Sequence, residues 1–106
     1  MRTEKTIKAN TAPAIKCQAP WRLAYVKPLD NYCLAVEFND GIHGLVDMKK
    51  RIYSRHAGIF ATLKDMHLFK QVYLSYGVAT WPNEIDLAPD TMHDEIKTKG
   101  KWVLNA

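Results

Sequence analysis

The chain has little of what marks several classes of protein. Its 106 residues include only two cysteines, Cys17 and Cys33, which form no CxxC pair and do not predict a disulfide framework. No apolar run is long enough for a transmembrane helix. No apolar segment follows Arg2, Lys5 and Lys8, so we expect no secretory signal. Together these absences predict a cytoplasmic protein in a reducing compartment.

The composition that remains is that of one ordinary globular domain. Hydrophobic residues make up 47% and charged residues 25%, enough for a core without covalent staples. Residues 1–20 lack any periodicity and contain Pro13 and Pro20, which predicts a mobile N-terminal arm. We expect a single α+β domain over residues 21–100 and a C-terminal tail over residues 101–106. The net charge of +4 permits nucleic-acid binding but does not favour it.

Two hairpins are predicted from alternation and turn residues. Residues 22–27 predict a strand that Pro28 ends, followed by a turn at Asp30-Asn31. Residues 32–38 then alternate, and their apolar side chains share one face: Tyr32, Leu34, Val36 and Phe38. A three-residue loop, Asn39-Asp40-Gly41, pairs Phe38 with Ile42 and keeps this face whole. It also places Gly41 at the left-handed position of such a loop.

The second half predicts helices around another hairpin. Asp47 can cap a helical turn over residues 48–53, and Thr62 and Asp65 both offer caps for a short helix to about Lys70. Residues 72–75 and 78–81 form a hairpin across Tyr76-Gly77. A last helix begins at Pro89 and stops at Gly100. The predicted fold is α+β, with about five antiparallel strands in β-β-β-α-β-β-α order and helices packed on one face.

Several segments carry a family resemblance. They are Leu34-Ala-Val-Glu-Phe38-Asn-Asp-Gly41, Gly58-Ile-Phe60, Leu63-Lys-Asp65 with Phe69, and Trp81-Pro-Asn-Glu-Ile-Asp86-Leu-Ala-Pro-Asp90. Over about residues 21–95 the chain resembles the bacterial domain-of-unknown-function family numbered 2442. The resemblance implies a small cytoplasmic α+β domain without established activity. It also implies a gene context like that of a toxin–antitoxin pair.

The chain departs from that family in two places. Glu84 stands where members often have glycine, and the N-terminal arm has no counterpart in the pattern. The block that carries the resemblance also supplies residues with expected structural roles. These are Gly41, Trp81, Pro82, Asp86, Pro89 and Asp90. For Asp86 two roles stay open: acceptance of backbone N–H bonds within its loop, which we favour, or presentation of a carboxylate to a partner.

The sequence predicts no catalytic residue, no metal site and no cofactor. Its histidines, His43, His56, His67 and His93, lack metal spacing, and the acids beside His93 suit a helix start. An enzyme would require at least two of Asp47, Asp86, Asp90 and His93 to converge within hydrogen-bond reach in a deep pocket, which we do not expect.

Candidate contacts with a protein partner, or with a second copy, lie in two segments. One is a basic stretch and the other an apolar tail that docks on its own domain or on another chain. The residues are Lys49, Lys50, Arg51, Arg55, Trp102 and Leu104. The leading hypothesis is a non-enzymatic interaction module resembling the antitoxin-like side of a gene pair. Nucleic-acid binding through residues 49–55 is the alternative, and an unknown enzyme is the third.

Overall fold

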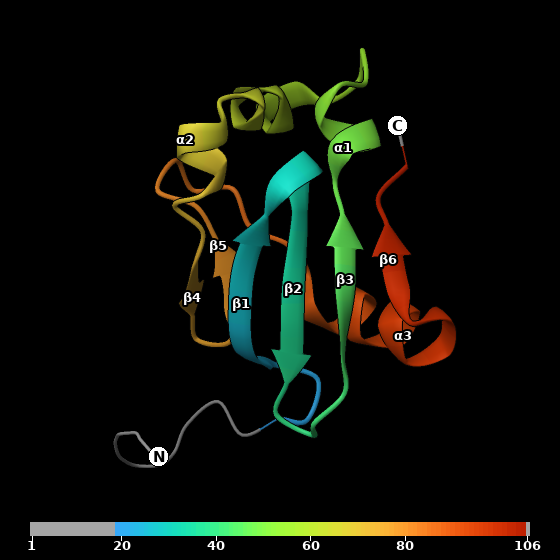
Figure 1. The fold of residues 1–106 in the computed structure, drawn as a ribbon. Coiled ribbons are helices and arrows are strands. Elements are labelled where there is room, and N and C mark those ends of the chain that lie inside the picture. Colours follow the sequence, from blue (N-terminus) through green and yellow to red (C-terminus); the bar gives the residue numbers. More distant parts are fainter. Residues whose placement is uncertain (1–18, 106) are drawn as a thin grey trace.

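The computed structural model describes residues 19–105, which form a four-stranded sheet, a two-stranded sheet and helices on one side (Figure 1). The larger sheet has the order β1-β2-β3-β6 and the smaller one pairs β4 with β5. The strands are β1 Leu23–Leu29, β2 Cys33–Phe38, β3 His43–Asp47, β4 Tyr73–Ser75, β5 Val78–Thr80 and β6 Lys101–Val103. The helices are η1 Asp30–Tyr32, α1 Lys49–Ile52, η2 Gly58–Lys64, α2 Met66–Phe69 and α3 Pro89–Lys99.

The α+β prediction is confirmed, with a different division of the strands. The larger sheet is mixed, because β6 runs parallel to β3 while the other pairs are antiparallel. The hairpin across Tyr76-Gly77 forms as predicted but makes its own sheet. It touches β1 through one bond, from the Leu23 N–H to the Gly77 carbonyl (2.9 Å). The β-β-β-α-β-β-α order holds, and β6 is added after it.

The first strand does not end at Pro28, as the sequence predicted. It continues to Leu29, and Pro28 pairs with Leu34. Proline is tolerated there because β1 is an end strand, and backbone groups on its outer side have no neighbouring strand with which to form hydrogen bonds. The turn at Asp30-Asn31 is confirmed, although left-handed backbone at Asn31 and Tyr32 (φ 62° and 60°) delays the start of β2 to Cys33.

The register of the β2–β3 hairpin is the predicted one. Leu34 pairs with Val46, the Phe38 N–H donates to the Ile42 carbonyl (2.8 Å), and Gly41 has φ 90°. Leu34, Val36 and Phe38 are buried together. Tyr32 precedes the strand but also packs against the core. The other face of the sheet remains open to solvent, since Leu45 is 44% exposed there.

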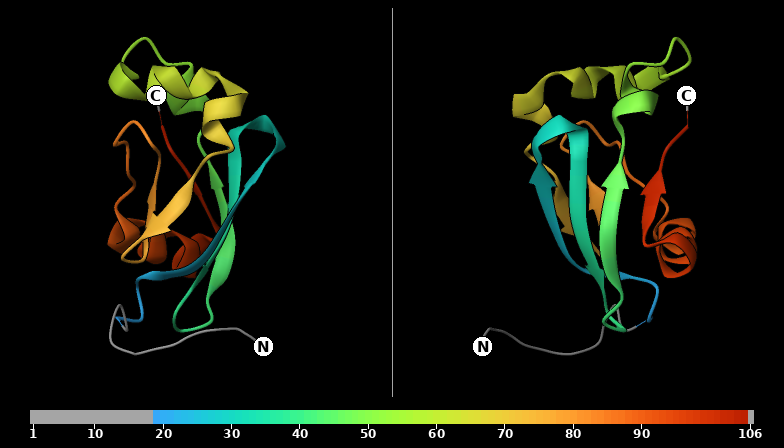
Figure 2. Two further views of the ribbon diagram at one scale, coloured as in Figure 1. Left: turned by 90° about the vertical axis from the view of Figure 1, so that its left-hand side faces the viewer. Right: turned by 45° about the vertical axis from the view of Figure 1, so that its right-hand side comes forward.

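The short helices cap one end of the sheet. The Asp47 carboxylate accepts the Lys49 N–H at the start of α1 (3.1 Å), and Asp65 accepts the His67 N–H at the start of α2 (3.0 Å). Thr62 lies inside η2 and is not a helix cap. Two further views show that the helices and the small sheet lie on one side of the larger sheet (Figure 2).

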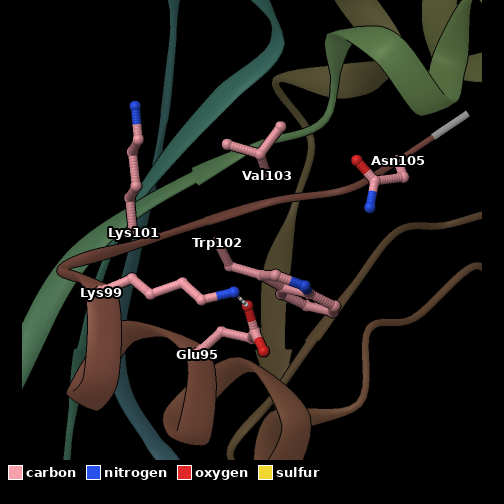
Figure 3. A pocket seen from close by; sticks show the side chains of 6 residues that line it. All are labelled: Glu95, Lys99, Lys101, Trp102, Val103 and Asn105. Carbon is pink, nitrogen blue, oxygen red and sulfur yellow. Dashed lines mark hydrogen bonds and ion pairs between the residues drawn. The ribbon is translucent and has the colours of Figure 1, made fainter.

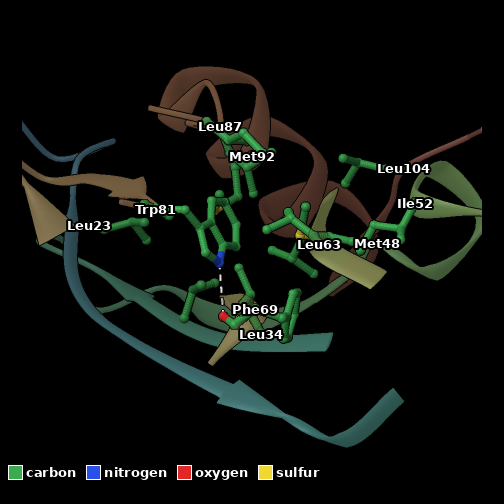
Figure 4. Close-up of a cluster of buried hydrophobic side chains, with 14 of the residues drawn as sticks. Leu23, Leu34, Met48, Ile52, Leu63, Phe69, Trp81, Leu87, Met92 and Leu104 are labelled. Atoms are coloured by element: carbon green, nitrogen blue, oxygen red, sulfur yellow. Dashed lines mark hydrogen bonds between the residues drawn. The ribbon is translucent and has the colours of Figure 1, made fainter. Parts of the chain in front are cut away.

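The core lies between the larger sheet and α3 (Figure 4). Trp81 is fully buried, and its indole N–H donates to the Phe69 carbonyl (2.8 Å). Met92 and Ile96 of α3 are buried against the sheet, and Pro89 and Gly100 bound the helix as predicted. A Cβ on Gly44 would lie 2.5 Å from the Gly100 carbonyl oxygen, so this glycine lets β3 approach the end of α3.

Three further expectations concern the chain as a whole. None of the helices among residues 19–105 is long and apolar enough to cross a membrane. Cys33 is a free thiol, and burial raises its pKa, with a further rise from nearby Asp47. Cys17 and nearly all of the predicted mobile arm lie outside the described residues.

Candidate interaction groove beside strand β6

The predicted C-terminal tail supplies the end strand of the larger sheet. Left-handed backbone at Gly100 (φ 83°) ends α3, and β6 then pairs with β3 in parallel, Trp102 beside Val46. The Leu104 N–H donates to the Asp47 carbonyl (2.9 Å). Successive backbone groups of a strand point in opposite directions within the sheet, so the Val103 N–H faces the outer edge. Within residues 19–105 no strand lies beyond that edge.

Two hollows lie against β6 and share Trp102, Val103 and Asn105 in their walls; we call them together the β6 groove. The first, of about 440 Å³, is completed by Glu95, Lys99 and Lys101. In Figure 3 Trp102 and Val103 point to opposite sides of the strand, and the Lys99 ammonium pairs with Glu95 (3.0 Å). The second, of about 360 Å³, is completed by Leu104 and by residues from three other segments: Arg51, Phe60, and the run Asp86, Leu87 and Ala88.

Arg51 has unused bonding capacity at the wall of this groove. Its guanidinium carbon lies 5.4 Å from the centre of the Phe60 ring. The Nε atom is buried and has no hydrogen-bond partner, and no carboxylate among the described residues pairs with the guanidinium. A half-buried arginine with free donors is a strong site for a planar anion such as a carboxylate.

The structure brings together three of the six residues predicted as partner contacts. Arg51, Trp102 and Leu104 line the second hollow, although about half the chain separates the first from the others. Leu104 is only 8% exposed and belongs to the core, so the tail docks on its own domain, one of the two predicted alternatives. Lys49, Lys50 and Arg55 are exposed and lie outside the walls of the groove.

Residues that the sequence did not single out complete the groove. Phe60 lies in η2, and Lys101 and Val103 lie in β6. The signal for β6 was available in the short apolar run Trp102, Val103 and Leu104 after the helix stop. A run of three residues is too short to predict a strand without its partner.

Asp86 does not take the role that we favoured for it. Among the described residues its carboxylate accepts no hydrogen bond, and the backbone alone joins the fold through a bridge to Thr80. The side chain is exposed on the wall of the groove. The turn before it is held by backbone bonds instead, from the Trp81 N–H to the Ile85 carbonyl and from the Glu84 N–H to the Trp81 carbonyl.

The remaining block residues occupy structural positions. Pro82 opens the exposed turn after Trp81, and Pro89 is the first residue of α3. The Asp90 carboxylate accepts the Thr91 N–H (2.9 Å) in the first helical turn, where the helix dipole favours an acid. Glu84 has φ 70°, the left-handed backbone that glycine adopts without cost.

The histidines and acids considered for catalysis lie in separate places. His93 Nε2 lies 2.7 Å from Asp40 Oδ2 in the β2–β3 loop and edge-on to Phe38. Its partner is therefore neither Asp90 nor Asp94. The Asp47 carboxylate accepts a backbone N–H at the start of α1, while Asp86 lies in the wall of the β6 groove. Within residues 19–105 no three His, Cys, Asp or Glu side chains are grouped so that they could hold a metal ion.

A comparison with protein families matches residues 23–98 to the family described as a protein of unknown function, DUF2442. The chain belongs to this family. The match covers more than half of the sequence and includes every strand and helix except β6 and the last residue of α3. The family resemblance noted from residues 34–90 is therefore confirmed. Neither the curated proteins nor the solved structures gave a match. In this DUF2442 chain all the residues contributed by β6 to the groove lie beyond the matched segment.

Proposed function

We propose that this DUF2442 chain is a non-enzymatic protein-interaction module, the antitoxin-like partner in a small bacterial gene pair. It acts in the cytoplasm by binding an extended segment of its partner protein along β6, and so blocks the surface through which the partner acts. One observation carries the proposal. Arg51, Trp102 and Leu104, each expected to contact a partner from its own sequence context, line one hollow beside the outer edge of a sheet.

Strand addition is the binding mode that this edge supports. A strand with one free side offers backbone donors and acceptors to a second chain, and pockets beside it select side chains. At β6 the outward Val103 N–H supplies the donor, and the two hollows beside the strand supply the pockets. Trp102, half-buried between them, has the large apolar surface typical of binding hot spots.

The test compares two substitutions at Val103 in the native host. Val103→Pro removes the outward N–H but leaves the Leu104 bond to Asp47 in place, whereas Val103→Ala keeps the N–H. We expect a discrete partner to co-purify with the wild-type chain and with Val103→Ala, and to be lost with Val103→Pro. Thermal melting of each purified variant controls for unfolding. A chain that elutes alone as a monomer, or a partner retained equally by folded Val103→Pro, contradicts the proposal.

A second candidate function is nucleic-acid binding, which is supported by the exposure of the basic stretch. Lys49, Lys50 and Arg55 are exposed, and no carboxylate in residues 19–105 forms an ion pair with them. Such cations would neutralise phosphates and release counterions. Binding to mixed-sequence duplex DNA at increasing salt decides this. Under this candidate the affinity falls steeply with salt, and Lys50→Gln reduces the slope by about one. If the chain does not bind the DNA even at low salt, nucleic-acid binding is excluded.

A further inference from the structure

The bonding capacity of the β6 groove indicates what kind of segment it binds. We propose that the segment is acidic, an extended strand in which a carboxylate side chain pairs with Arg51 while apolar side chains lie against Trp102 and Phe60. This inference rests on the proposed function, because it describes the chemistry of the partner at the same site.

The first argument is the state of Arg51. Its buried Nε has no acceptor, and stacking on Phe60 holds the guanidinium at the wall of the second hollow. The Nε atom is closed to solvent, but the two terminal nitrogens are not buried in this way and form no hydrogen bond within residues 19–105, so they are the donors that an arriving acceptor can meet. A carboxylate accepts two parallel N–H bonds from the planar fork, which a neutral amide does not match.

The second argument is the charge around the strand. Lys99 ends α3 and Lys101 follows in β6, both in the walls of the groove, while Lys49 and Lys50 precede Arg51 in α1 outside those walls. Within the walls of the groove Glu95 and Lys99 pair with each other, which leaves the cations of Arg51 and Lys101 against the single acid Asp86. This balance favours approach and binding of an acidic segment.

The same charges argue against the two occupants available from the chain itself. Residues 1–18 carry four basic side chains and the single acid Glu4, so the arm would add cations to a basic edge. The bases are Arg2, Lys5, Lys8 and Lys16. A second copy paired along β6 would bring a further Lys101 to the same edge, while its Lys99 would already be paired with its own Glu95. Like charges placed together across an interface oppose binding, so the occupant is a different chain.

The shape of the site gives the side-chain pattern of the segment. Residues of a bound strand point alternately to the two sides of the sheet. The core side of β6 presents Trp102, Phe60 and Leu104 together with Arg51, and the other side presents Lys101 and Val103. We therefore expect one acid that reaches Arg51, apolar neighbours two positions away, and further acids on the side of Lys101.

The experiment selects random twelve-residue peptides displayed on phage against the full chain, and then measures selected peptides by fluorescence anisotropy. We expect selected peptides to be rich in Asp and Glu that alternate with apolar residues. Their affinity should fall roughly tenfold to a hundredfold with Arg51→Gln, and partly with Arg51→Lys, which keeps the charge without the fork. Asp86→Asn should raise it, and higher salt should lower it.

Lys70→Gln is the matched control, because it removes an exposed cation at the end of α2, on the side of the molecule away from β6 (Figure 1). Two outcomes overturn the acidic-segment inference but leave strand addition at β6 intact. Either the selected peptides lose binding to Val103→Pro but contain no acidic residues, or they bind Arg51→Gln as tightly as the wild type. If no peptide is selected, or selected peptides ignore Val103→Pro, both this inference and the proposed function fail.

Discussion

The imidazole Nε2 of His93 lies 2.7 Å from the carboxylate Oδ2 of Asp40, so α3 is joined directly to the loop between β2 and β3. The hydrogen bond from His93 lowers the pKa of Asp40, against a smaller opposing effect of desolvation. The other oxygen of the same carboxylate accepts the Ile42 N–H (3.1 Å) and shapes the hairpin loop. One side chain therefore serves both the loop and its attachment to the helix.

This contact predicts a pH dependence of folding. A carboxyl with a lowered folded-state pKa stabilises the fold above the ordinary aspartate pKa of about 4, and this contribution is lost as the pH falls further. Asp40→Asn keeps the acceptor for Ile42 but removes the charge. In urea unfolding, the wild type should exceed Asp40→Asn at about pH 6, and the difference should shrink at about pH 3.

Asp94→Asn is the control for this experiment, since Asp94 is exposed on α3 and makes no ion pair among the described residues. Its unfolding free energy should follow the wild-type pH profile. A difference between wild type and Asp40→Asn that stays constant across this pH range would show that the charge on Asp40 does not stabilise the fold.

Gly44 should not tolerate a side chain. In Gly44→Ala the new Cβ would lie 2.5 Å from the Gly100 carbonyl oxygen and 2.7 Å from Ile96 Cγ2, so β3 and α3 must separate. We expect a loss of about 1–3 kcal/mol in the free energy of urea unfolding. Leu45→Ala, one residue along on the open face, should change it by only about 0.5 kcal/mol. Equal stability of Gly44→Ala and wild type would refute the close approach.

Glycine at position 84 should stabilise the chain. Glu84 has φ 70°, which costs a residue with a Cβ about 1–2 kcal/mol, while the added chain entropy of glycine costs about 0.5–1 kcal/mol. Glu84→Gly should therefore raise the free energy of unfolding by roughly 0.5 kcal/mol. Glu37→Gly, an exposed change within β2, should lower it. Thermal and urea unfolding of both variants give the comparison, and a fall for Glu84→Gly would contradict the backbone argument.

Local patterns predicted the local structure well. The register of the β2–β3 hairpin followed from the alternation of Leu34, Val36 and Phe38, because a shift by one residue would have exposed all three. The ends of α3 followed from Pro89 and Gly100, whose effects act within one turn. The prediction that the first strand ends at Pro28 was wrong. A strand tolerates proline when it lies at the edge of its sheet, and the position of β1 is a property of the whole sheet.

The candidate site was predictable in its residue types but not in its location. Arg51 was predicted as a partner contact because it lies in a basic stretch, and Trp102 because it lies in an apolar tail. Their meeting depends on the parallel pairing of β3 with β6, whose strands are far apart in the sequence. Asp86 was assigned a loop-locking bond that backbone groups of Trp81 and Glu84 make instead. Side-chain direction at such a turn is fixed by tertiary packing, which short-range patterns do not contain.

The parallel pairing of β3 with β6 also sets an order of events during synthesis. The outer side of β3 has no strand to bond until residues 101–104 have left the ribosome, since only then can the Leu104 N–H reach the Asp47 carbonyl. The surface that we assign to the partner is built from those same residues. Under the proposed function, a nascent chain would become competent for a partner only after β6 has paired with β3, so that partially made copies would not compete for it.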